Sequence, residues 1–182
     1  LVPMGSSAMA AVMLGLMVQS TAVTFGAVGT PILVGVRGGL QGVVENQLGA
    51  ANVSMPHYLQ LITTDVAILH ALVGTFMPLF MVCMMTRYFG ERKSWREGFE
   101  ILPFALFGGV AFTIPYLLTG IFLGPEFPSL LGSLIGMTIV VMASKNGFLM
   151  PKKNWDFPER SKWPPMWLGD LETDFMENIS AD

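Results

Sequence analysis

Residues 1–36 contain no charged side chain, yet this apolar run is interrupted by two glycines and a proline, at Gly26, Gly29 and Pro31. A run this apolar is typical of a membrane span, but closely spaced glycines and a proline do not continue a plain helix. Irregular backbone at membrane depth is tolerated where it is buried in protein or lines a water-filled cavity. Broken helices of this kind hold the substrates of transporters. The sequence therefore predicts a broken or re-entrant membrane helix with a loop over residues 25–31.

The composition independently indicates a membrane protein. Hydrophobic residues make up 52% of the chain and charged residues 13%, against about 25% charged in an ordinary soluble domain. The Lys and Arg residues form no basic face, so a nucleic-acid partner is not expected. The single cysteine, Cys83, excludes a disulfide framework within the chain. No spacing typical of a metal site, a cofactor site or a nucleophile–base pair occurs, so neither a cofactor nor an enzymatic activity is expected.

Four apolar segments predict an all-α polytopic membrane protein. Their approximate bounds are 4–24, 58–87, 101–123 and 127–144. The second contains a core of 21 residues at 66–86, which spans about 31 Å as a helix and matches the hydrocarbon thickness. Pro78 lies in that core and predicts a kink rather than an end, because neighbouring helices satisfy the freed carbonyl.

Basic residues cluster on two of the connections between these segments. One cluster lies in the 87–100 loop and the other in the 145–182 tail, whereas the 37–57 link holds only Arg37 and the 124–128 turn holds no Lys or Arg. The positive-inside rule then predicts that the 87–100 loop and the 145–182 tail are cytoplasmic. The link and the turn face outward, and the acidic end of the tail, from residue 170 to 182, is expected to be mobile.

Glycine pairs spaced four residues apart predict close packing between helices, because small residues let backbones approach in lipid. The pairs are Gly35/Gly39, Gly120/Gly124 and Gly132/Gly136. We interpret them as packing signals only.

Polar side chains precede the predicted loop and make it a candidate substrate site. Gly26 and Gly29 allow the backbone to approach a ligand, and Thr30 and Pro31 are typical of the N-cap and the first position of a new helix. A helix start favours an anionic group. The alternative is a glycine-kinked helix packed against its neighbours. The candidate substrate-binding residues are Gln19, Ser20, Thr21, Thr24, Phe25, Gly26, Gly29, Thr30 and Pro31.

His70 and Arg37 are candidates for proton coupling or anion attraction. Ionisable residues inside a membrane are functional candidates by default, and His70 lies within the second apolar segment. Asp65 is five residues away, so on a straight helix the two side chains point about 140° apart and do not form a pair. His70 either titrates or remains a neutral imidazole bonded to a neighbouring helix. Arg37 either attracts an anionic substrate or anchors at the interface.

Two motifs resemble segments of the L-lactate permease family. Residues 20–34, STAVTFGAVGTPILV, resemble its FGAxGxPI segment. Residues 116–128, which end in FLGPEFP, look like a second segment of that family. In that segment, Phe and a hydrophobic residue precede Gly-Pro-Glu, and a hydrophobic residue and a proline follow it. The two motifs occur in the family's order and at a similar separation, with a charged, Trp-containing loop between them.

The resemblance implies a secondary transporter that moves L-lactate, glycolate or a similar 2-hydroxy monocarboxylate together with protons across the cell membrane. It also implies inverted repeats, with residues 25–31 forming one substrate-site loop beside Ser20, Thr21 and Thr24. Family members are longer, so we expect this chain to be a fragment from the N-terminal half, whose partners are membrane lipid and the remainder of the permease. The alternatives are a membrane interaction subunit that docks through its tail, or a carrier of another organic anion.

Overall fold

The computed structural model describes residues 6–19, 23–151 and 155–168, and the regular elements in those ranges are all helices. Four of them are long and apolar enough to cross a membrane. They span Val23–Leu40, Met55–Phe89, Leu102–Phe122 and Pro128–Lys145. The prediction of an all-helical polytopic membrane protein with about four spans is therefore confirmed, while the inverted repeat stays a prediction.

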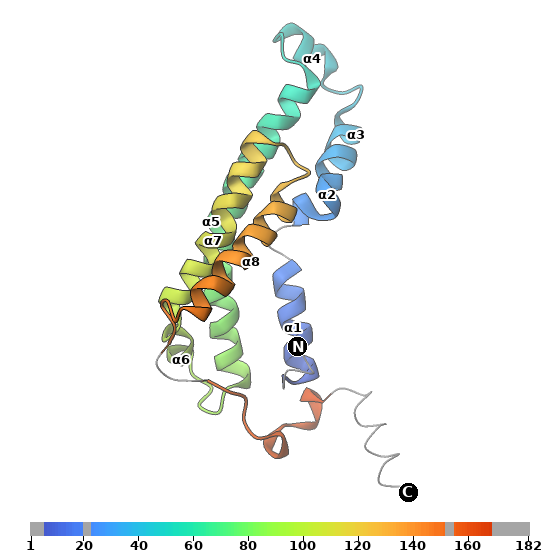
Figure 1. The fold of residues 1–182 in the computed structure, drawn as a ribbon. Coiled ribbons are helices and arrows are strands. Elements are labelled where there is room, and N and C mark those ends of the chain that lie inside the picture. Colours follow the sequence, from blue (N-terminus) through green and yellow to red (C-terminus); the bar gives the residue numbers. More distant parts are fainter. Residues whose placement is uncertain (1–5, 20–22, 152–154, 169–182) are drawn as a thin grey trace, which may run out of the picture.

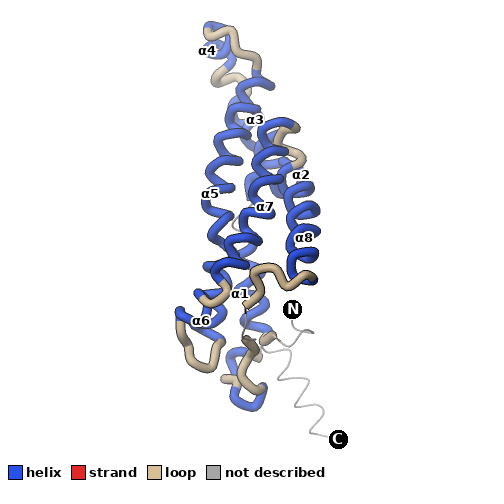
Figure 2. The backbone as a smooth tube through the Cα atoms, turned by 60° about the vertical axis from the view of Figure 1, so that its left-hand side comes forward, coloured by secondary structure: helices blue, strands red, loops and turns tan. Residues whose placement is uncertain are grey.

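The longest helix is α5 (Met55–Phe89), and α7 (Leu102–Phe122) runs alongside it in the opposite direction (Figures 1 and 2). Ser54 begins α5, because its hydroxyl accepts a hydrogen bond from the His57 amide at 3.4 Å and a proline occupies the first turn. With 35 residues, α5 is about 52 Å long and extends beyond the hydrocarbon layer. Pro78 lies inside α5 without ending it.

Small residues bring α8 (Pro128–Lys145) against α7. A Cβ placed on Gly132 would lie 3.0 Å from the Cβ of Tyr116, and one on Gly136 would lie 2.9 Å from the Cα of Phe112. The predicted packing role of Gly132 and Gly136 is therefore confirmed. The packing role predicted for Gly35 and Gly39 is not confirmed, because nothing in the part of the chain that the structure describes lies within 4 Å of a Cβ at either position.

The first predicted span, 4–24, is described by the structure only in part. Its described helix, α1 (Ala8–Gln19), has 12 residues and is about 18 Å long, and because residues 1–5 and 20–22 lie outside the described residues, the span stays a prediction. The chain continues through η2 (Val23–Phe25), α2 (Gly26–Thr30), η3 (Pro31–Val36) and α3 (Arg37–Leu40). In both views α1 lies toward one end of the bundle and α2–α3 toward the other (Figures 1 and 2).

The connections gather at two opposite ends of the molecule. At one end of the molecule lies α4 (Glu45–Ala50), a short helix within the predicted 37–57 link (Figure 1). At the other end lie α6 (Trp95–Phe99), η4 (Arg160–Lys162) and η5 (Pro165–Trp167) (Figure 1). The basic loop and the tail thus share an end, and the assignment of that end to the cytoplasm stays a prediction.

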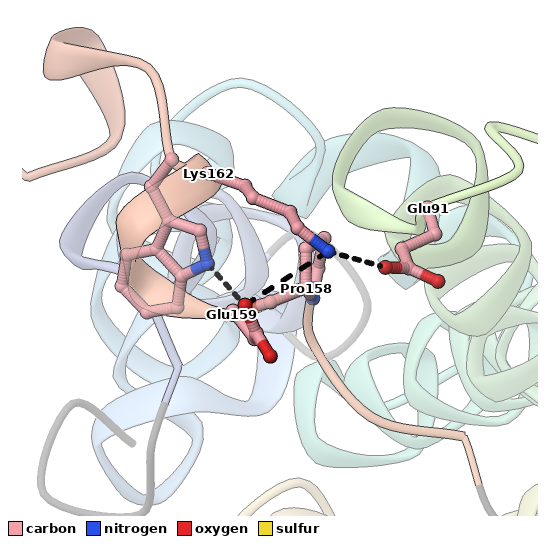
Figure 3. Close-up of polar contacts among 5 residues, drawn as sticks. Glu91, Pro158, Glu159 and Lys162 are labelled. Carbon is pink, nitrogen blue, oxygen red and sulfur yellow. Dashed lines mark hydrogen bonds and ion pairs between the residues drawn. The ribbon is translucent and has the colours of Figure 1, made fainter.

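The described part of the tail packs on the chain's own helices. Trp167 is buried in a cluster with Ala10 of α1 and with Met85 and Phe89 of α5. Lys162 reaches Glu91 at 3.5 Å and Glu159 at 3.9 Å (Figure 3). These exposed ion pairs contribute little, so the aromatic burial holds the tail in place. The stretch 170–182, predicted to be mobile, lies outside the described residues.

Candidate functional site

The break in the first membrane-crossing segment is a left-handed turn. Ala27, Val28 and Gly29 have φ values of 46°, 58° and 75°. This conformation is disfavoured by about 1–2 kcal/mol per residue for side chains with a Cβ, and for β-branched Val28 it is a genuine outlier. Such a turn persists only where its surroundings hold it. The predicted broken helix is confirmed, and its left-handed residues, 27–29, lie within the predicted loop at 25–31.

The end of the break differs from the predicted capping arrangement. Pro31 begins the following helical segment, η3, as predicted. Thr30, however, already has right-handed helical angles and makes no side-chain cap bond. Its hydroxyl instead donates to the carbonyl of Ala27 at 2.6 Å. Thr30 was predicted as an N-cap because its residue type favours that role, but the left-handed turn places the Ala27 carbonyl within its reach.

The turn between α7 and α8 braces the break. A Cβ on Gly29 would collide with the backbone carbonyl of Pro125. The hydroxyl of Ser129, in the first turn of α8, donates to the carbonyl of Phe25 at 2.7 Å. The close approach expected at Gly29 is thus made by the protein's own backbone. Gly26 differs, since nothing described lies within 4 Å of a Cβ there.

A buried aromatic and polar cluster lies beneath the break. Phe25 and Tyr116 are fully buried, and the Phe25 ring makes edge contacts with His70 at 5.9 Å and Tyr116 at 5.4 Å between ring centroids. A hydrogen bond of 2.7 Å joins Nδ1 of His70 to the Tyr116 hydroxyl. On the other side of the ring, Nε2 lies 3.4 Å from the Thr24 hydroxyl. Thr24, His70 and Tyr116 therefore form a polar chain that joins the broken helix, α5 and α7.

The other predicted site residues do not all meet this chain. Gln19 is exposed at the end of α1, and Ser20 and Thr21 lie outside the described residues. Arg37 is exposed and lines a separate cavity of about 340 Å³. That cavity is further lined by Gln41, Glu45, Leu48, Gly49, Val53 and Met55.

Sequence reasoning missed two members of the site, Tyr116 and Ser129. A buried tyrosine hydroxyl usually finds a partner, so a tyrosine in the middle of an uncharged span was a usable signal for Tyr116. Ser129 carried no such signal, because serine bonds its own helix as often as a neighbour. No group of three potential metal ligands occurs among the residues that the structure describes.

These features define a polytopic helical membrane protein with one discontinuous span and a polar chain packed beside the break. A family model described as L-lactate permease matches residues 1–164. The chain belongs to the L-lactate permease family, and it is a multi-pass protein of the cell membrane.

Individual relatives agree with this assignment. The chain is 27% identical over 157 residues to an L-lactate permease of Bacillus subtilis, which covers 86% of this chain and 23% of the relative. It is 27% identical over 179 residues to an L-lactate permease of Halalkalibacterium halodurans, and the match covers 92% of this chain and 30% of the relative. It is also 27% identical over 146 residues to the glycolate permease GlcA of Escherichia coli, and the match covers 80% of this chain and 22% of the relative. No solved structure matches the chain.

Proposed function

We propose that this chain forms part of a secondary transporter that moves L-lactate or a similar 2-hydroxy monocarboxylate across the cell membrane together with protons. Membership of the L-lactate permease family supports a transporter rather than an enzyme. The relatives are L-lactate permeases and a glycolate permease, and lactate and glycolate are both 2-hydroxy monocarboxylates.

The observation that carries the proposal is the left-handed break at Ala27–Gly29 beside the Thr24–His70–Tyr116 chain. A hydroxycarboxylate presents acceptors and a hydroxyl group, which suit hydroxyl donors and free backbone N–H groups. The helix that begins at Pro31 adds the positive end of its dipole. Thr24 and the backbone around Gly26 therefore bind the carboxylate, while the fully buried Phe25 ring packs against His70 and Tyr116 behind them.

The rest of the site comes from outside this chain. The chain spans between 22% and 30% of the length of the relatives compared above. Large apolar side chains such as Leu72, Val73 and Phe76 are exposed on α5, and lipid and the remainder of the permease cover such faces. An inverted second copy of this unit would place a matching break opposite the first, so residues 24–31 form one half of the substrate site.

The test is uptake of labelled L-lactate into vesicles by the full reading frame that contains this chain. Thr24→Val removes one hydroxyl at nearly constant shape. A hydrogen bond to a charged group contributes about 1.5–3 kcal/mol, so the KM for lactate is expected to rise about tenfold or more. The matched control is Thr138→Val, whose hydroxyl is exposed and bonds the Leu134 carbonyl of its own helix.

Two outcomes contradict the proposal. The first is lactate uptake by the full protein no higher than in empty vesicles. The second is an unchanged KM in Thr24→Val, which would remove Thr24 from the substrate site. Competition by unlabelled glycolate, pyruvate and acetate then separates a 2-hydroxy acid carrier from a carrier of another organic anion.

A further inference from the structure

We infer that His70 carries the coupled proton, and that its bonds to Tyr116 and Thr24 link protonation of the ring to binding of the anion. This inference rests on the proposed function and names the residues that couple the two events.

His70 lies deep in the bundle. It is 15 residues from the first residue of α5 and 19 from the last, which places it about 22 Å and 28 Å from the two ends along the helix. An ionisable side chain at that depth is held for function or is fully paired. Imidazole is the side chain whose charge changes between about pH 5 and 8.

The two partners of His70 require a change of hydrogen-bond roles on protonation. A neutral imidazole has one N–H donor and one bare nitrogen, so one of its two partners donates to the ring. In the protonated ring both nitrogens donate, to the Tyr116 hydroxyl at 2.7 Å and toward the Thr24 hydroxyl at 3.4 Å. Both hydroxyl groups then only accept from the ring, and their own hydrogens are free for another acceptor.

Thr24 connects the protonation of His70 to the break. It lies directly before Phe25 and two residues before Gly26, where space is open. Once the ring is protonated, the Thr24 hydrogen is available to a carboxylate oxygen beside the break, and the imidazolium charge attracts the same anion. Proton and anion binding therefore favour each other, which is the requirement for symport.

The surrounding charges support an anionic substrate as the counter-charge. The elements packed around His70 carry His57, Asp65 and Arg87 on α5, Lys145 on α8, Arg37 toward the end of the broken span and Glu126 in the turn. Asp65 is exposed and about 140° around the helix from His70. Arg87 and Lys145 lie in the last turns of their helices. The described ring contacts come from Thr24, Phe25 and Tyr116, which are neutral, so no carboxylate there balances a protonated ring.

The experiment separates translocation from coupling in the full-length protein reconstituted into vesicles. Exchange of labelled for unlabelled lactate without any gradient measures translocation. Accumulation under an imposed pH gradient measures coupling, and one proton per anion gives about a tenfold accumulation per pH unit. We expect His70→Gln to exchange lactate at every pH with the weaker KM that the wild type shows at pH 8, to lose the fall in exchange KM between pH 8 and pH 5.5, and to show no accumulation. The control is His57→Gln, an exposed histidine at the start of α5, which should match the wild type.

Tyr116→Phe tests the positioning role of the tyrosine. It removes the acceptor for Nδ1–H, and the loss is larger for a charged ring than for a neutral one. The pH at half-maximal uptake is therefore expected to move to a lower pH, while Tyr88→Phe, at an exposed position, leaves it unchanged. A merely structural tyrosine would alter the amount of folded protein but not this midpoint.

Three results would overturn the inference. They are accumulation by His70→Gln at the wild-type level, loss of exchange by a His70→Gln protein that elutes as a single folded species, and a pH profile of Tyr116→Phe that superimposes on that of the wild type. If His70→Gln does not fold, the Tyr116→Phe profile decides. Failure of the proposed function is distinguishable, because the wild-type protein itself would then exchange no lactate.

Discussion

Gly29 lies directly against the backbone carbonyl of Pro125, so the left-handed break and the turn between α7 and α8 pack as one unit. The two residues are far apart in sequence, yet both belong to the motifs that resemble the permease family. Their contact gives both motifs a structural role, because each supplies the surface against which the other packs.

The contact predicts that an added methyl group destabilises the protein at Gly29 but not at Gly26. Gly29→Ala places a Cβ on the Pro125 carbonyl at a φ of 75°, and an overpacked site of this kind is destabilised by about 1–3 kcal/mol. Gly26→Ala meets open space and should stay within about 0.5 kcal/mol of the wild type. Thermal unfolding of the purified full-length protein in detergent measures both, and equal melting temperatures would contradict the contact.

The bond from Ser129 to the Phe25 carbonyl predicts a second difference. Ser129→Ala leaves that carbonyl without its donor and should lower stability by about 1 kcal/mol. Ser133→Ala is the matched control, because the Ser133 hydroxyl is exposed and bonds the Ser129 and Leu130 carbonyls of its own helix. The same unfolding measurement applies. A larger effect in Ser133→Ala would show that Ser129 does not hold the break.

Neighbouring glycines in α7 should respond differently to an added methyl group. A Cβ on Gly109 would collide with the Thr75 carbonyl of α5, whereas one on Gly108 meets only a Val140 methyl at 3.9 Å. Gly109→Ala should therefore separate the helices and destabilise the protein by about 1–3 kcal/mol. Gly108→Ala should be neutral or slightly stabilising, since alanine favours helix over glycine. The yield of monodisperse protein on size exclusion reports the difference.

The docked tail predicts a contrast between adjacent residues. Trp167 is 8% exposed in a cluster with α1 and α5, whereas Met166 is 69% exposed. Trp167→Ala should release the tail, because truncating a buried aromatic side chain costs about 3–5 kcal/mol, and limited proteolysis of the tail should become faster. Met166→Ala and Lys162→Ala should leave the cleavage rate near that of the wild type, because exposed ion pairs contribute about 0–1 kcal/mol.

The predicted orientation is tested by labelling single cysteines in intact cells. In a Cys83→Ser background, Gly49→Cys in α4 should react with a membrane-impermeant maleimide, and Glu91→Cys should react only after the cells are permeabilised. Both positions are exposed, so access rather than burial decides the labelling. The reverse pattern would invert the orientation.

The sequence alone determined the class of the protein and the place of the break. Long uncharged segments require helices in lipid, since only internal hydrogen bonding satisfies the backbone there. Two glycines and a proline inside such a segment prevent a continuous helix. The packing role of Gly132 and Gly136 also followed from residue type, because small residues allow close helix contacts.

The tertiary structure decided what the break touches. The bond between His70 and Tyr116 joins residues 46 apart, and the bond between Ser129 and Phe25 joins residues 104 apart. No local pattern encodes such contacts, because they depend on how α5, α7 and α8 pack around the broken helix.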